Sequence, residues 1–288
     1  MSWVTPLASI RIGGPGRRPG QASQDRWPRP PAWASISPGS GSKEGVQPSE
    51  MTDGRIIYLL FARRPEAGKV KRRLAAEIGA EAAAELYSAF LDDILDAVRQ
   101  TGSPFAIGCT PYSAVEYFRS LAPEAEEVFH QEGGDLGERM AAAFERFFRA
   151  GWGRVVILGS DIPLLSPAIL REAGEALKEA PIVLGPCRDG GYYLIGLTEP
   201  VPKLFSGIDW GTGKVLDQTL AKLRRVGSGS RLLGELEDID RAEDLERLAA
   251  GFVQRLSEGG YLPDRTRWAM GRLSKRVEEW QLCGKPGR

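Results

Sequence analysis

A strongly basic stretch is the first of several segments whose residue types and spacing could carry chemistry. An apolar run ends at Phe61 and leads into Ala-Arg-Arg-Pro-Glu-Ala-Gly-Lys-Val-Lys-Arg-Arg-Leu. Backbone amides of a glycine-containing loop and of a helix N-terminus can bind phosphate oxygens, and Lys or Arg neutralises their charge. Because strand, loop and helix follow in the order such a site requires, we favour phosphate binding over a solvated basic turn. The predicted residues are Ala62, Arg63, Pro65, Gly68, Lys69, Lys71 and Arg73, with Ser160 from a second loop.

Two aspartates could bind a divalent cation. Asp161 follows the apolar run Val155–Leu158, which places its carboxylate at the end of a predicted strand. Mg²⁺ prefers hard oxygen ligands, often one or two carboxylates together with substrate phosphates. Asp240 could supply the second carboxylate. Each has a plainer interpretation: Asp161 as an acceptor in the turn before Pro163, and Asp240 with Glu243 as the capping box of a helix.

Two glycine-containing segments could bind a substrate. Glycines permit close backbone approach to a ligand, and a carboxylate can accept hydrogen bonds from sugar hydroxyls, although a tight turn between two strands explains the first segment equally well. The aromatic ring in the second segment could be a platform for a sugar or base, or part of the core. The candidate residues are Asp189, Gly190, Gly191 and Tyr192 in the first segment, and Trp210, Gly211 and Thr212 in the second.

The elements that must position these residues alternate between short apolar runs and helical patterns. Predicted strands cover 56–61, 105–109, 127–130, 154–158, 182–185, 192–197 and 231–235. Predicted helices lie between them, marked by apolar stripes and by start signals at Asp135, Ser166-Pro167 and Asp240. This alternation predicts an α/β fold, with a mostly parallel mixed sheet flanked by helices. Ligands then bind beyond the carboxyl ends of the strands, which is where the candidate residues lie.

Composition excludes several classes of function. Lys plus Arg and Asp plus Glu each total 38, so no global field attracts nucleic acid. The three cysteines lack zinc-site spacing, and with His130 as the single histidine a Ser-His-Asp hydrolase is disfavoured. No apolar run approaches the roughly 18 residues of a membrane span. Well-separated cysteines favour a reducing cytoplasm.

The chain divides into three predicted regions. Residues 1–53 are rich in Pro, Gly and Ser without hydrophobic periodicity, which predicts a disordered leader, and Met51 is a candidate natural start. Residues 54–250 form the predicted catalytic domain. In residues 251–288 the pattern weakens, and Trp268, Leu273, Val277 and Trp280 predict one more helix that packs against the domain or a partner.

Four motifs, taken together and in order, resemble a bacterial family of glycosyltransferase-A-like proteins of the arsenosugar-biosynthesis type. Its relatives include molybdenum-cofactor guanylyltransferase and phospholactate guanylyltransferase. The family pattern F-A-K-x-P-x-x-G-x-V-K-T-R-L is matched except that Arg63 replaces Lys and Arg72 replaces Thr. The other motifs are Gly159-Ser-Asp161 with Pro163, the segment 189–197, and 210–212. Asp240 matches the aspartate of a V-D-T-P-E-D-L-like element, in which Arg241 and Ala242 replace Thr-Pro.

The resemblance implies a Rossmann-like nucleotide-diphospho-sugar transferase fold (GT-A) over about residues 56–248. It implies that Asp161 and Asp240 bind Mg²⁺ or Mn²⁺, and that Asp161 and Lys71 act in catalysis. The expected activity is metal-dependent glycosyl transfer from a nucleotide-sugar to a small-molecule acceptor, by a monomer or homodimer. A nucleotidyltransferase that uses an NTP, or a nucleotide-binding protein without turnover, are the alternatives.

Overall fold

The computed structural model describes residues 54–282, which contain one seven-stranded sheet. The strand order is β3-β2-β1-β4-β6-β5-β7. Strands β3, β2, β1 and β4 are parallel, β6 is antiparallel to both of its neighbours, and β7 is parallel to β5. The predicted mostly parallel mixed sheet is therefore confirmed. The strands are β1 (Ile56–Arg63), β2 (Phe105–Thr110), β3 (Glu127–His130), β4 (Arg154–Leu158), β5 (Ile182–Pro186), β6 (Tyr192–Leu197) and β7 (Ser230–Leu232).

Strand β7 is shorter than predicted, because it ends at Leu232 rather than residue 235. Its neighbour β5 ends in Pro186, which has no N–H to donate, and the register of β5 against β6 shifts at Gly185 and Pro186. Beyond Leu232 the chain stays beside β5 through isolated bonds, including one from the N–H of Leu236 to the carbonyl of Pro186. This irregular segment continues toward the carboxyl edge of the sheet.

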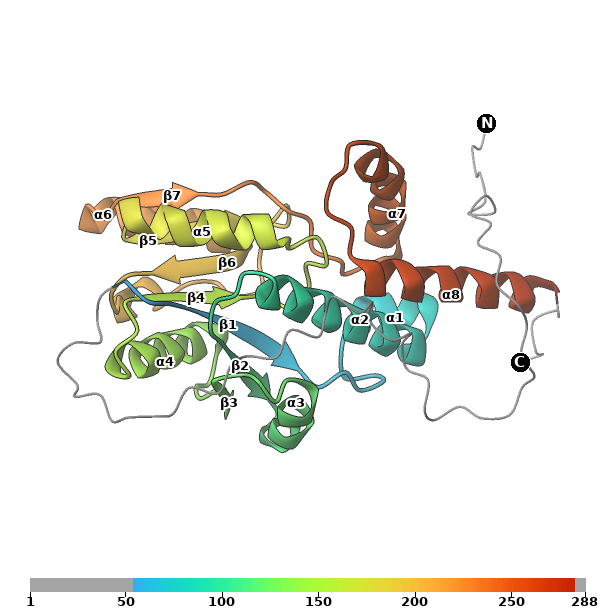
Figure 1. The fold of residues 1–288 in the computed structure, drawn as a ribbon, viewed down its shortest axis with the longest axis horizontal. Coiled ribbons are helices and arrows are strands. Elements are labelled where there is room, and N and C mark those ends of the chain that lie inside the picture. The colour runs from blue at the N-terminus through green and yellow to red at the C-terminus, as the bar shows by residue number, and fades with distance from the viewer. Residues whose placement is uncertain (1–53, 283–288) are drawn as a thin grey trace. The chain divides into compact units, whose positions relative to one another are not determined.

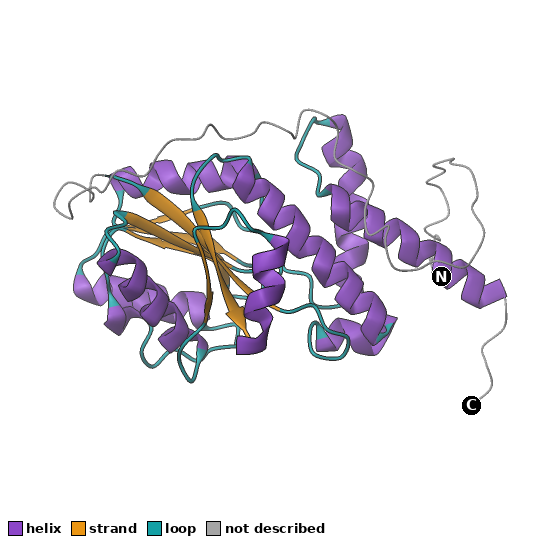
Figure 2. Cartoon of the chain, turned by 60° about the horizontal axis from the view of Figure 1, so that its bottom comes forward, coloured by secondary structure: helices purple, strands orange, loops and turns teal. Residues whose placement is uncertain are grey.

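Helices cover both faces of the sheet (Figures 1 and 2). Residues of α4 and α6 pack in one cluster with the sheet, while α2 and α5 pack on the opposite face. The helices are α1 (Arg72–Ile78), α2 (Ala80–Arg99), α3 (Val115–Leu121), α4 (Leu136–Arg149), α5 (Pro167–Glu179), α6 (Val215–Val226), α7 (Ala242–Ser257) and α8 (Asp264–Leu282), with short 3₁₀ turns η2 (Tyr112–Ala114) and η3 (Pro202–Leu204).

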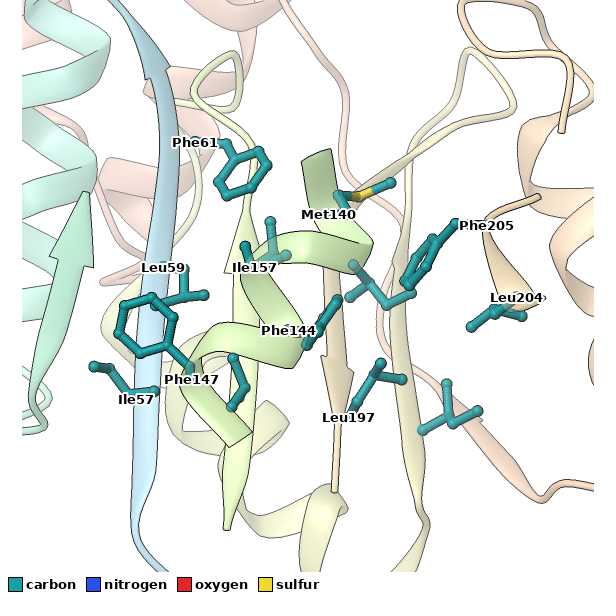
Figure 3. Packing of buried hydrophobic residues seen from close by; sticks show 14 of the residues in the cluster. Ile57, Leu59, Phe61, Met140, Phe144, Phe147, Ile157, Leu197, Leu204 and Phe205 are labelled. Atoms are coloured by element: carbon teal, nitrogen blue, oxygen red, sulfur yellow. The ribbon is translucent and has the colours of Figure 1, made fainter. Parts of the chain in front are cut away.

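Alternation along β1 shows how the sequence specifies the two layers. Ile57, Leu59 and Phe61 belong to the cluster that contains Phe144 of α4 (Figure 3). Tyr58 points to the other face, where its hydroxyl donates a hydrogen bond of 2.6 Å to the carbonyl of Leu170 in α5. Successive side chains of a strand point to opposite faces, so an apolar run buried on both sides is typical of a central parallel strand.

Two predicted helix starts are confirmed and one is wrong. The Asp135 carboxylate caps α4 by accepting from the N–H of Glu138 at 2.8 Å, and Ser166 caps α5. Helix α7, however, begins at Ala242 rather than at Asp240. The Asp244 carboxylate accepts from the N–H groups of Asp240 and Arg241, at 2.8 and 2.7 Å. Asp244 therefore does the capping that we predicted for Asp240 and Glu243.

The C-terminal helix α8 packs along α2. The buried Asp93 carboxylate of α2 accepts from the N–H groups of Arg265 and Thr266, at 2.9 and 2.8 Å, and so caps the first turn of α8. In the described residues this helix therefore lies against α2 of the domain. Helix α7 runs continuously through residue 251, where the sequence predicts a domain boundary. The predicted leader lies outside the described residues.

None of the helices in residues 54–282 is both long and apolar enough to cross a membrane.

Candidate active site

The predicted segments meet at the carboxyl edge of the central strands. Leu60 of β1 pairs with Leu158 of β4, so the loops after these parallel strands leave the sheet at the same edge. Strand β6 runs the opposite way, so the turn between β5 and β6 lies at this edge too. The irregular segment after β7 arrives there as well, because the N–H of Ile239 donates to the carbonyl of Asp161 at 3.2 Å. Backbone pairing thus brings Asp161 and Asp240 to one place.

Lys71 lies between Asp161 and Asp240, which together we call the acid pair. Its Nζ is 2.7 Å from Oδ1 of Asp161 and 3.0 Å from Oδ1 of Asp240. Arg73 reaches the same pair from outside, with Nη1 at 3.4 Å from Oδ2 of Asp240. The structure therefore brings together the two predicted metal ligands and two of the predicted phosphate-binding cations.

Burial and charge distinguish Lys71 from the acids that it contacts. Its side chain is 3% exposed, whereas those of Asp161 and Asp240 are 48% and 40% exposed. Burial by itself lowers the pKa of an ammonium group, but the two carboxylates outweigh it, and the pKa of Lys71 is raised above its ordinary value. The Lys71 side chain is therefore a buried cation that contacts two partly exposed anions.

The backbone of Lys71 is also unusual. Its φ of 46° and ψ of 48° lie in the left-handed region, and among residues 54–282 it is the one non-glycine residue with positive φ. Such a conformation costs on the order of 1–3 kcal/mol and persists where surrounding contacts hold it. Here the ion pairs and the first helical bond, from Ala75 N–H to the Lys71 carbonyl, hold it at the start of α1.

Apart from Lys71 and Arg73, the charged residues of the basic loop for which contacts are seen do not pair with Asp161 or Asp240. Lys69 and Arg64 both pair with Glu66, and the Arg64 guanidinium also lies over the ring of Tyr117, 5.4 Å from its centroid. Gly68 has a φ of 75°, which glycine adopts without strain. Arg63 is exposed at the end of β1, Pro65 is half-buried, and the buried Ala62 lies within β1. Arg64 and Lys69 are therefore paired with an acid of the loop itself.

Tyr87 of α2 is a site residue that the sequence analysis missed. Its hydroxyl accepts from the backbone N–H of Arg63 at 3.0 Å and shares a hydrogen bond of 2.9 Å with Oγ of Ser160. Burial, and then the negative charge of Asp161, raises the pKa of Tyr87. One hydroxyl therefore ties the end of β1 to the loop that carries Asp161. The signal was a tyrosine beside an apolar helical stripe, because a buried tyrosine hydroxyl usually finds a partner.

The two predicted substrate segments also come together. The carbonyl of Gly190 accepts from the N–H of Leu216 at 2.9 Å, which joins the turn between β5 and β6 to the start of α6. Within each segment the polar side chains bond locally: Asp189 accepts from the N–H of Gly191 at 2.8 Å, and Thr212 donates to the carbonyl of Asp209 at 2.7 Å. The predicted tight turn between β5 and β6 is therefore confirmed.

Trp210 lies at the edge of the core. A Cβ on Gly137, in the first turn of α4, would come within 2.6 Å of its Nε1, and its ring meets that of Tyr192 edge-on at 6.4 Å between centroids. Gly211 follows it in the exposed part of the loop. The partly buried indole therefore packs against the protein, and its predicted role as a platform stays a prediction.

Asp238 adds a further carboxylate near the acid pair. Burial raises its pKa to about 6, with smaller contributions from Asp189 and Asp240 in the same direction, whereas Lys71 lowers it. The N–H of Arg188 donates to the carbonyl of Leu236 at 3.1 Å, so the first substrate segment lies beside the segment that leads to Asp240. Asp238 is a second residue near the site that the sequence did not single out.

The donor set fits Mg²⁺ or Mn²⁺ bound together with a substrate. Within residues 54–282, no group of three or more His, Cys, Asp and Glu side chains could hold a metal ion. Two carboxylates that reach one cation position, as Asp161 and Asp240 do for the Lys71 ammonium, match the way Mg²⁺ binds through one or two carboxylates, with water and phosphate oxygens as further ligands.

A cavity of about 270 Å³ lies beside α7 and does not include the acid pair. Its lining contains Glu237 and Ile239 but neither Asp161 nor Asp240. The acid pair therefore opens to solvent through its own exposed faces rather than through this cavity.

Comparison with known proteins places the chain. A solved structure from Desulfovibrio desulfuricans G20, provisionally named a nucleotide-diphospho-sugar transferase, is 36% identical over 67% of this chain and 85% of its own, with a TM-score of 0.64. The chain belongs to the family of this protein. It accordingly has the nucleotide-diphospho-sugar transferase fold, as predicted. A family model described as an uncharacterized protein conserved in bacteria, DUF2064, matches residues 94–212. The narrower arsenosugar-type assignment stays a prediction.

More distant structures are also similar to this chain. Rv0371c from Mycobacterium tuberculosis H37Rv, whose manganese complex has also been solved, is 20% identical over 67% of this chain and 97% of its own, with a TM-score of 0.43. The 4-diphosphocytidyl-2C-methyl-D-erythritol synthase of Anaerococcus prevotii DSM 20548 is 13% identical over 71% and 99%, with a TM-score of 0.48. No curated protein matches the sequence.

Proposed function

We propose that this protein is a metal-dependent glycosyltransferase that uses a nucleotide-sugar donor. The observation that supports the proposal is the position of Lys71 between Asp161 and Asp240, at the carboxyl edge of the parallel strands. Two partly exposed acids beside a cationic loop can bind a diphosphate together with a divalent ion. The provisional name of the Desulfovibrio relative points to the same class of donor.

Several of the predicted residues then have a role in binding or orientation. Asp161 and Asp240 would hold Mg²⁺ or Mn²⁺, which when bound disperses the charge that develops on the leaving diphosphate. Lys71 and Arg73 supply positive charge for the same oxygens, and the backbone around Gly68 offers N–H donors. Ser160, held by Tyr87, keeps the Asp161 loop in place. The turn at Asp189 and the loop after Trp210 would orient the sugar and the acceptor.

Nucleotidyl transfer is the alternative that the same site allows. It would consume an NTP and a phosphorylated small molecule and release pyrophosphate, whereas glycosyl transfer releases the nucleotide of the donor. The two reactions therefore differ in a product that can be measured directly.

The experiment has a binding step and a product step. Purified protein is screened by thermal shift against nucleotides and nucleotide-sugars, each with and without Mn²⁺. A ligand at about a hundred times its Kd stabilises by about 2.7 kcal/mol. Donors that bind are then incubated with candidate acceptors, and release of nucleotide or of pyrophosphate is followed. Release of pyrophosphate from an NTP would replace the proposal with nucleotidyl transfer, and the absence of metal-dependent binding by any nucleotide would refute both.

A further inference from the structure

The Lys71 ammonium occupies the position that a divalent ion bound to the same two oxygen atoms would need. Its Nζ lies 2.7 Å from Oδ1 of Asp161 and 3.0 Å from Oδ1 of Asp240. Mg²⁺ binds carboxylate oxygens at about 2.0–2.1 Å. An ion that bridged these oxygen atoms would fall inside the van der Waals envelope of the ammonium nitrogen, so the two cations exclude each other there.

Electrostatic repulsion also keeps the Lys71 ammonium group and a divalent ion from occupying this position together. Two carboxylates that approach one point repel each other unless a cation lies between them, and Lys71 supplies that cation in the structure described here. A divalent ion within a few ångströms of a fixed ammonium group meets strong repulsion, which is largest where water is excluded. Since the Lys71 side chain is 3% exposed, solvent screens this repulsion little.

The Lys71 side chain can move from its position between the acids toward solvent. The acids on either side are 48% and 40% exposed, so the ammonium lies just beneath an open surface. A lysine side chain is a flexible four-carbon stem with a compact charge, and it can reorient without movement of the sheet. The exposed cation Arg73, at 67% exposure, marks the side on which an incoming phosphate would find positive charge.

We propose that Lys71 is an internal cation that holds Asp161 and Asp240 together before the metal binds, and that the divalent ion displaces it toward the phosphates of the substrate. This inference rests on the proposed function, because it takes the two acids as metal ligands. It makes metal binding and phosphate binding interdependent: the ion releases the ammonium group, and the phosphate then receives it.

The test measures Mn²⁺ binding to the full-length protein by calorimetry, with inorganic pyrophosphate as the anionic probe. In Lys71→Met the competing charge is gone, and Mn²⁺ should bind about tenfold more tightly than in the wild type. The melting temperature of this variant should be lower without metal and should rise more when Mn²⁺ is added. Lys178→Met is the control, because Lys178 is an exposed lysine that pairs with Glu175 on the surface of α5, away from the two acids. Its Mn²⁺ affinity should equal that of the wild type.

Pyrophosphate distinguishes displacement from simple repulsion. In the wild type Mn²⁺ should strengthen pyrophosphate binding by a larger factor than in Lys71→Met, in which no ammonium can be released. Lys71→Gln, which is polar and neutral, gives the same comparison if the methionine variant does not fold. Equal or weaker Mn²⁺ binding in the neutral variants would overturn the inference and leave the proposed function intact. No Mn²⁺ binding by the wild type or either variant would overturn both.

Discussion

The carbonyl of Asp161 accepts a hydrogen bond of 3.2 Å from the backbone N–H of Ile239. This bond joins the loop after β4 to the segment before α7, and it places Asp240 one residue beyond the junction. The distance between the two acids is therefore set by backbone pairing as well as by their side chains. Substitution of either carboxylate should leave this junction in place.

Replacing Asp161 by Asn should remove metal-dependent activity while the fold is retained. An amide is a far weaker ligand for Mg²⁺ than a carboxylate. Residues that only hydrogen-bond to a metal ligand typically change activity by about 10- to 100-fold when mutated, so for a ligand itself we expect a loss of at least about 100-fold in kcat/KM. Steady-state kinetics with Mn²⁺ titration measures this, and circular dichroism checks the fold. Glu175→Gln is the control, since this exposed carboxylate pairs with Lys178 on the surface of α5. Unchanged turnover in Asp161→Asn would exclude its metal role.

Tyr87→Phe should affect both stability and substrate binding. The change leaves the Arg63 N–H and the Ser160 hydroxyl without their partner, which costs about 1–3 kcal/mol. Because these two groups border the acid pair, KM for the nucleotide should rise several-fold.

Tyr58→Phe provides the matched control for that prediction. It removes another buried tyrosine hydroxyl, whose partner is the carbonyl of Leu170 in α5. Urea unfolding should show a comparable loss of stability, while KM stays at the wild-type value. If the two variants have the same kinetics, Tyr87 has a structural role alone.

Gly190→Ala should strongly destabilise the turn between β5 and β6. Gly190 has a φ of 87°, and a Cβ there would overlap the carbonyl of Gly213 in the loop before α6. Gly211 has a similar φ of 77°, but no atom lies within 4 Å of the Cβ that Gly211→Ala would add. The first variant should lose more free energy of unfolding than the second, which pays only the backbone cost of about 1–3 kcal/mol. If both variants lose the same free energy of unfolding in urea, the turn at Gly190 and the loop at Gly213 can move apart at little cost.

Asp93 should make stability fall as the pH rises. Burial raises its pKa from 3.8 to about 7 in the folded protein, even though bonds from Arg265 and Thr266 act in the opposite direction and nearby Asp96 adds to the rise. Between these two values the folded state binds more protons than the unfolded state. The contribution of Asp93 to stability is therefore fully present below pH 3.8 and is lost as the pH rises through about 7.

Asn at position 93 removes this titration and keeps an oxygen that can accept from the first turn of α8. Urea unfolding from pH 4.5 to 8 should therefore show a flatter pH dependence for Asp93→Asn than for the wild type. Identical slopes in the two proteins would contradict the prediction.

Local pattern was enough to predict most of the fold. The apolar runs at β3, β4 and β6 gave the strand bounds found in the structure, and Asp135 and Ser166 cap the helices that they were predicted to cap. These features depend on side-chain alternation and on contacts three residues apart, both of which are visible in the sequence. The carboxyl-edge location of the basic loop and Asp161 follows from the parallel sheet itself.

The sequence by itself determined the layered α/β fold and the residue types present at one edge of the sheet. Only the tertiary structure decided how those residues pair: Lys71 lies between acids that are up to 169 positions away, and Asp244 rather than Asp240 caps α7. It also decided that Tyr87 reaches across to Ser160. Periodicity records which face of an element is buried, but the partner of a charged side chain depends on backbone junctions such as that between Asp161 and Ile239, which join segments distant in sequence.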